Sequence, residues 1–227
     1  MKVLHTGRVI EVEPFSSDYL NEALGVCKLR KHRALTMPEI VDIKIENPFN
    51  TDLWRDLYIS TSMKAIGLSR QGKKRIVYSH LKDNYFSSPG NILEAIDKGL
   101  KKGAGIILNL DFYRLIELDG LTDEKGNRLV WVLDYDNRRG VPKSFTIEDA
   151  LDDPETIPFL GGGERAIHYL QMHGEMYDNK ILLDHSNEFN GENIGWLLYL
   201  GNFLIKGLYG NYPLNSSGNF LGTPEEN

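Results

Sequence analysis

The sequence predicts an α+β fold, with a mainly antiparallel sheet and hairpins in the first two-thirds of the chain and helices mostly in the last third. Alternation of apolar and polar residues, which is typical of half-buried strands, recurs as far as Tyr135. Apolar residues at helical spacing predominate from Glu164 onward. Because the strands precede most of the helices instead of alternating with them, a doubly wound parallel sheet is not expected.

The chain has 227 residues, which is long enough to bury a core without a disulfide or a metal. We expect one α+β domain over residues 1–212, followed by a mobile or docked tail over residues 213–227 that is rich in Asn, Ser and Gly. The composition excludes collagen-like, coiled-coil and wholly disordered proteins.

The formal net charge of −6 argues against nucleic acid as the main partner. Cys27 is the single cysteine, so no internal disulfide forms and a reducing, cytoplasmic location is expected. The first residues lack the apolar run of a signal peptide. The longest apolar stretch, residues 194–205, is too short and too interrupted to cross a membrane.

A first strand is predicted over residues 9–12, which Pro14 ends. A helix follows, with a capping serine at Ser16 or Ser17 and a buried face made of Leu20, Ala23, Leu24 and Cys27. Its basic end, Lys28–Arg33, is either a solvated terminus that matches the helix dipole or a phosphate-binding patch.

Three more strands are predicted over residues 41–46, 57–61 and 75–80, the first from the alternation of Val41, Ile43 and Ile45 with charged residues. A helix then begins near Asn91, with Ile92, Ile96 and Leu100 as its buried stripe. A hairpin is expected next, with strands over residues 106–118 and 129–135 and a turn over residues 123–126.

The last third is predicted to be more helical. A short helix or turn opens at Thr146, and a longer helix over residues 164–177 follows three glycines. After a short strand over residues 180–184, a helix is predicted over residues 193–208 from the spacing of Trp196, Leu200, Phe203, Leu204 and Leu208.

Two carboxylates mark the first candidate site. Asp134 and Asp136 are two residues apart on an extended chain and therefore point the same way. Oxygen ligands of this kind bind Mg²⁺ or Mn²⁺. The structural alternative is a strand-end ion pair, with Asp136 facing Arg114 across the predicted hairpin.

Glu164 and His168 lie four residues apart on one face of the predicted helix, as an acid–base pair would, or simply as part of a solvated face. His185 follows a buried strand and opens a loop, which is a common position for a catalytic group. These three residues are the candidate catalytic groups.

Aromatic residues gather near the C-terminus: Trp196, Tyr199, Phe203, Tyr209, Tyr212 and Phe220. The first three fit the core face of the predicted helix. The last three, together with neighbouring asparagines, indicate either a surface for a protein partner or for self-association, or a segment that docks on its own domain.

No recognised catalytic signature is present. The sequence therefore favours a soluble intracellular binding or assembly protein that acts through a protein–protein surface and requires no cofactor for folding. The alternative hypothesis is a metal-assisted hydrolase or transferase with a phosphoester or nucleotide substrate. It would use Asp134 and Asp136 to hold Mg²⁺ or Mn²⁺ and His185 as the general base, with Glu164 as the other candidate base.

Overall fold

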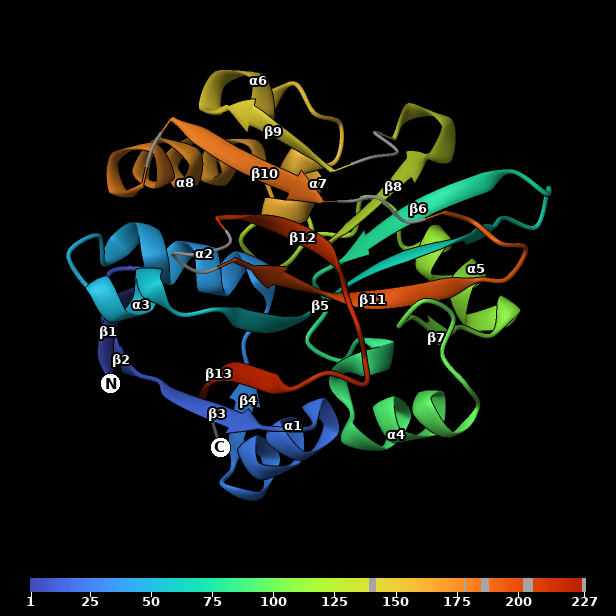
Figure 1. Cartoon of the computed structure of the whole chain (residues 1–227), viewed down its shortest axis with the longest axis horizontal. Helices are drawn as coiled ribbons and strands as arrows, with labels where there is room; N and C mark the ends of the chain where they lie inside the picture. Colours follow the sequence, from blue (N-terminus) through green and yellow to red (C-terminus); the bar gives the residue numbers. More distant parts are fainter. Residues whose placement is uncertain (139–141, 178, 185–187, 202–205, 226–227) are drawn as a thin grey trace.

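The computed structural model describes residues 1–138, 142–177, 179–184, 188–201 and 206–225. Its centre is a mixed sheet of eleven strands (Figure 1). These are β3 (Glu13–Ser17), β4 (His32–Ala34), β5 (Tyr58–Leu68), β6 (Lys74–Ser79), β7 (Gly105–Ile106), β8 (Val130–Asp134), β9 (Lys143–Thr146), β10 (Lys180–Asp184), β11 (Ile194–Leu200), β12 (Gly207–Tyr212) and β13 (Gly218–Pro224).

The main path through the sheet runs β3-β13-β5-β11-β12-β10-β9. Strand β6 pairs with β5 and β8, β4 pairs with β13, and β7 pairs with β11. The β10–β12 and β13–β5 pairs are parallel. A separate antiparallel ribbon joins β1 (Lys2–His5) to β2 (Arg8–Glu11). Strand β13, which lies within the segment expected as a tail, is therefore part of the sheet beside β5.

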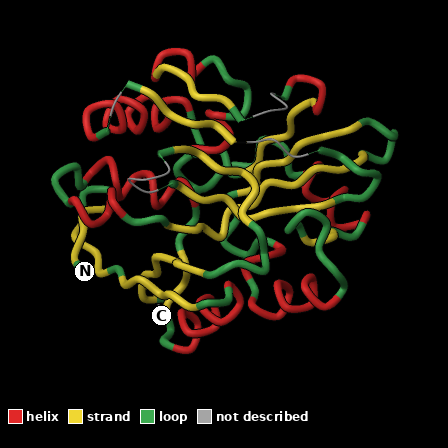
Figure 2. Tube along the Cα trace, viewed as in Figure 1, coloured by secondary structure: helices red, strands yellow, loops and turns green. Residues whose placement is uncertain are grey.

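Helices are spread along the whole chain and surround the sheet (Figure 2). They are α1 (Leu20–Leu29), α2 (Met37–Glu46), α3 (Thr51–Arg55), α4 (Pro89–Asp97), α5 (Asn109–Glu117), α6 (Ile147–Leu151), α7 (Thr156–Leu160) and α8 (Gly163–Met176), with short 3₁₀ turns at Tyr85–Ser87 and Tyr135–Asn137. The predicted fold class, with strands in the first two-thirds and helices mostly in the last third, is therefore wrong. None of the described helices is long and apolar enough to cross a membrane.

The largest error concerns residues 193–208, which were expected to form a helix. They contain β11 and the start of β12, two neighbouring antiparallel strands. Six of the seven residues of β11 are buried, so the strand is apolar on both faces. A short apolar run without alternation cannot be told from a buried helix by its periodicity.

Two predicted strands are helices. Residues 37–46 form α2, which starts at a capping box between Thr36 and Glu39 and has Pro38 in its first turn. Residues 109–117 form α5, with Phe112 buried, so the expected hairpin with residues 129–135 does not exist. Strand β8 pairs instead with β6. In both segments, the alternation of apolar residues coincided with helical spacing.

The sheet separates two apolar clusters. Helices α2, α3, α6, α7 and α8 contribute to the first cluster, which contains Leu198 and Leu200 of β11. Helices α1, α4 and α5 contribute to the second cluster, which contains Leu197. Cys27 of α1 lies in this second cluster, as expected, and burial raises the pKa of its thiol to about 12, so the thiol is unreactive.

A buried polar network crosses the first cluster. The ammonium of Lys64 on β5 lies 2.6 Å from Oε2 of Glu155, just before α7, and both side chains are fully buried. The hydroxyl of Tyr78 on β6 donates to the same carboxylate oxygen over 2.6 Å. Beside it, Nδ1 of His80 lies 2.8 Å from Oγ of Ser62, and Nε2 of the same ring lies 2.8 Å from the carbonyl oxygen of Pro158. This network joins the central strands to α7.

Replacing Glu155 with Gln is expected to destabilise the fold by about 3–5 kcal/mol, because it removes the carboxylate that pairs with the buried Lys64 ammonium. The free energy of unfolding in urea measures this. The double variant Lys64→Met/Glu155→Leu should recover most of the loss, since it removes both charges. As a control, Glu94→Gln removes the exposed ion pair with Lys98 and should change stability little. An equal effect of the two Gln variants would contradict the prediction.

Lys44 of α2 is also buried, with its ammonium over the rings of Trp54 at 5.4 Å and Tyr58 at 5.7 Å. Burial lowers the pKa of this lysine to about 7, and the nearby Asp56 opposes that shift only partly. The unfolded chain therefore binds a proton that the folded chain has lost when the pH lies between about 7 and 10.5. The contribution of Lys44 to the free energy of unfolding consequently rises with pH between about 7 and 10.5.

The variant Lys44→Met should be more stable than the original chain near pH 7. The difference should narrow as the pH rises from 7 to 9, by about 1.4 kcal/mol for each pH unit. Urea unfolding of both proteins at several pH values measures this difference. A difference that stays constant over this range would show that Lys44 does not titrate there.

Candidate functional site

Glu164 and His168 lie together, as predicted, in the first two turns of α8. Both side chains are exposed and line a cleft of about 560 Å³ with Arg128 and Trp131. Neither forms an ion pair or a hydrogen bond with another described residue, so the pair does not have the geometry of a coupled acid and base.

Gly161, Gly162 and Gly163, which join α7 to α8, form one wall of this cleft. Gly161 adopts a left-handed conformation with φ of 79°, and a Cβ there would lie 2.4 Å from Pro38, so only glycine fits this turn. Arg165 holds the turn in place, since it donates to the Gly161 carbonyl and to the Asp42 carboxylate of α2. The glycines therefore have a structural role in the junction between α7, α8 and α2.

Trp131 on β8 is a feature of this cleft that sequence reasoning missed. Its indole Nε1 is buried without a hydrogen-bond partner among the described residues, and the guanidinium of Arg128 lies 4.2 Å from the ring centroid. The sequence signal for this contact was the spacing of Arg128 and Trp131, three residues apart. Arg128 therefore occupies one face of the indole ring.

Asp134 and Asp136 do not converge with other ligating groups. Asp134 forms an ion pair with Arg75, its register partner on β6, while Asp136 is exposed in a 3₁₀ turn. The ion pair between Asp136 and Arg114 that was considered from sequence does not form, because Arg114 lies on α5 and pairs with Asp111. Among the described residues, no group of three or more His, Cys, Asp or Glu side chains could hold a metal ion. His185 lies outside the described residues.

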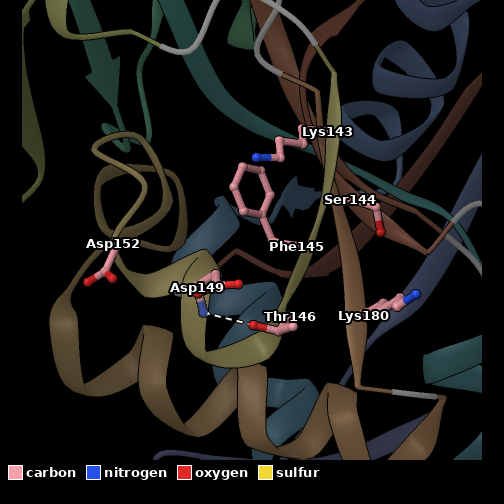
Figure 3. A pocket seen from close by; sticks show the side chains of 7 residues that line it. All are labelled: Lys143, Ser144, Phe145, Thr146, Asp149, Asp152 and Lys180. Carbon is pink, nitrogen blue, oxygen red and sulfur yellow. Dashed lines mark hydrogen bonds between the residues drawn. The ribbon is translucent and has the colours of Figure 1, made fainter.

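A second hollow, of about 410 Å³, lies beside β9, β10 and α6 (Figure 3). Its two lysines and two aspartates lie apart in this view: the Lys143 ammonium lies over the Phe145 ring at 5.1 Å, while Asp152 and Lys180 are on opposite sides. The backbone N–H of Asp149 donates to Thr146 Oγ1, which caps α6. This arrangement is a helix start beside a strand edge, without a catalytic constellation.

A row of polar and aromatic side chains crosses three neighbouring strands on the second-cluster side of the sheet. Asp184 of β10 is in register with Tyr209 of β12, which is in register with Tyr199 of β11. The rings of Tyr199 and Tyr209 are stacked with centroids 4.5 Å apart, and Tyr212 meets Tyr199 edge-on at 4.8 Å. We call Leu182, Asp184, Tyr199, Tyr209 and Tyr212 the tyrosine face.

The tyrosine face is only partly covered. Leu182, Asp184, Tyr199 and Tyr212 are all half-buried, and no helix is drawn in front of β10 or β12 in Figure 1. The helices of the second cluster pack farther along the sheet, with α1 on β13, α4 on β7 and α5 on β6. Within the described part of the chain, no helix therefore covers this end of the sheet on the second-cluster side.

Contacts with Gly207 and Ser217 help to position the rings of the tyrosine face. A Cβ on Gly207 would lie 2.9 Å from the Tyr209 ring and 2.5 Å from the Leu182 carbonyl oxygen, so the glycine gives the ring its place. The hydroxyl of Tyr212 donates to the Ser217 carbonyl oxygen over 2.6 Å. Burial, assisted by Tyr209 and Asp184, raises the pKa of Tyr199. The phenol therefore remains a neutral hydrogen-bonding group at ordinary pH.

The structure sorts the aromatic residues near the C-terminus differently from the sequence, which predicted a helix core for Trp196 and Tyr199 and a surface or docked segment for Tyr209, Tyr212 and Phe220. Trp196 and Phe220 are buried in the two clusters, while Tyr199 and Tyr212 are partly exposed and Tyr209 lies stacked beneath them. Phe203 is outside the described residues. The burial of Trp196 agrees with the prediction, but the core position predicted for Tyr199 is wrong, because residues 194–200 form a strand that places these two side chains on opposite faces.

Comparison with known proteins identifies the fold. No protein-family model and no curated protein match this chain. A solved structure described as "Accommodation of massive sequence variation in Nanoarchaeota by the C-type lectin fold" is similar to it, with 34% sequence identity and a TM-score of 0.84. The similarity covers 94% of this chain and 98% of that one.

This similarity overturns the predicted functions. The prediction of a soluble intracellular assembly protein is wrong, and so is the alternative prediction of a metal-assisted hydrolase or transferase. The related protein has a C-type lectin fold, which is a binding fold. The expectation of metal binding has no support among the described residues either. With this identity and coverage, the chain belongs to the family of C-type lectin fold proteins represented by the nanoarchaeotal structure.

Proposed function

We propose that this chain is a ligand-binding protein of the C-type lectin fold and that the tyrosine face is its contact surface. The observation that carries the proposal is the in-register row Asp184–Tyr209–Tyr199 across three strands that no described helix covers. A fold by itself does not define a function, so the proposal depends on the chemistry of this face.

Tyrosine suits a contact surface for physical reasons. Its ring offers a large apolar area with few rotatable bonds, and its hydroxyl both donates and accepts hydrogen bonds. The segment from Gly207 to Asn219 is rich in Tyr, Asn, Ser and Gly, which are the residues that antibody binding loops use most. Because these tyrosines stand on strands, they are more rigid than they would be on loops.

The face also lies where sequence can change at little cost. Along β10 and β11, each face residue alternates with a core residue: Asp184 follows buried Leu183, and Tyr199 follows buried Leu198. The related protein is described as accommodating massive sequence variation within this fold. In this chain, the alternating positions would allow the contact surface to vary while the other side of the same strands keeps the fold stable.

Substitutions at neighbouring positions test this separation. Tyr199→Ala and Asp184→Ala should each cost less than about 1.5 kcal/mol, while Leu198→Ala and Leu183→Ala should each cost about 2–5 kcal/mol because they leave cavities in the first cluster. Urea unfolding of the four variants measures this. If the variants at Tyr199 and Leu198, or at Asp184 and Leu183, lost equal amounts of unfolding free energy, the tyrosine face would be part of the stabilising core.

Retention on immobilised glycan and peptide libraries tests the binding function. The double variant Tyr199→Ser/Tyr212→Ser should lose retention on the ligands that the original chain binds. Tyr19→Ser, which alters an exposed tyrosine just before α1, serves as the control and should retain them. Retention that survives in the double variant would exclude the tyrosine face as the contact surface.

A further inference from the structure

A cleft of about 680 Å³ lies among the N-terminal ribbon, α1, β4 and β13, away from the tyrosine face. Two carboxylates, Asp83 and Glu225, line this cleft together with five cationic side chains, which are Arg8, Lys28, Arg33, Lys82 and Lys125. The chain as a whole carries a formal charge of −6, so this cleft has the opposite sign to the molecule around it.

Most of these cations have no carboxylate partner. Arg33 is held by two hydrogen bonds to Glu39, at 2.7 and 2.9 Å. Arg8, Lys28, Lys82 and Lys125 form no ion pair with any described carboxylate, and all four are exposed. They come from four segments far apart in sequence, namely β2, α1, the loop after β6 and the turn before β8. Tertiary structure thus gathers like charges that repel one another.

We propose that this cleft binds a small multivalent anion that carries phosphate groups. Lysine ammonium and arginine guanidinium groups are the side chains that bind phosphate oxygens most strongly. The volume lies within the range of sites for small molecules, and a concave wall of one charge concentrates the electric field within it. An anion with two or more charges would relieve the repulsion among the lysines and arginines.

The shape and charge of the molecule favour a small ligand over a nucleic acid. The positive side chains face one bounded cleft, whereas a nucleic-acid surface is an extended basic stripe or patch. A long polyanion would also meet the net negative charge of the remaining surface. A phosphate-binding patch was one of the two alternatives predicted from sequence for the basic end of α1. Of that run, Lys28 and Arg33 line the cleft, and the other cationic side chains of the cleft come from distant segments.

Calorimetric titration with inorganic pyrophosphate at constant ionic strength tests the site. The first variant is Lys28→Gln/Lys82→Gln, and a second, Arg8→Gln/Lys125→Gln, changes the other segments. The matched control is Lys101→Gln/Lys102→Gln, which also removes two positive charges. Its lysines lie outside the cleft and face Glu192 and Glu188 at 3.4 Å. The melting temperature of each variant shows whether it is folded.

We expect the original chain and the control to bind pyrophosphate with similar affinity, and each cleft variant to bind it about tenfold more weakly. Orthophosphate, with fewer charges, should bind more weakly than pyrophosphate. Equal weakening in the control and the cleft variants would show a general effect of net charge and overturn the proposal. Absence of pyrophosphate binding by the original chain would overturn it as well.

Discussion

The central strand β5 imposes the constraint on which the rest of the structure depends. Ten of its eleven residues are buried, and they include the polar side chains of Ser60, Ser62 and Lys64. A buried polar group without a partner costs more than a typical hydrogen bond contributes. Ser60 therefore donates to the Leu198 carbonyl oxygen on β11, Ser62 bonds His80, and Lys64 pairs with Glu155. These bonds hold β11 and α7 against β5 and so fix the layers of the domain.

The helical layer on the first-cluster side extends farther over the sheet than the layer on the second-cluster side, and this difference leaves the tyrosine face without a helix over it among the described residues. On one side, α6, α7 and α8 cover the sheet as far as β10 and β12. On the other side, α1, α4 and α5 pack over β13, β7 and β6. The same strand, β11, thus carries a leucine sealed in the core next to a tyrosine at the surface. A binding surface on such a strand combines a rigid backbone with side chains that the core does not need.

The two proposed sites differ in chemistry and in origin. The tyrosine face is built by neighbouring strands in register, and its rings are neutral hydrogen-bonding groups. The basic cleft is built by segments scattered between Arg8 and Glu225, and its character comes from charge that an otherwise acidic molecule gathers in one place. The triple-glycine turn and Asp134, which were candidate sites from the sequence, have structural roles instead.

The sequence by itself determined the elements whose local pattern matched their environment. Helices α1 and α8 and the buried state of Cys27 follow from amphipathic spacing, and strands β6 and β10 were predicted as short segments. It also placed Glu164 beside His168, because one helical turn separates them. Only tertiary structure decided that residues 194–200 form a strand, since a segment buried on both faces has no periodicity to read. The exposed tyrosines and the basic cleft were likewise decided by pairing between distant strands and loops, which no local pattern encodes.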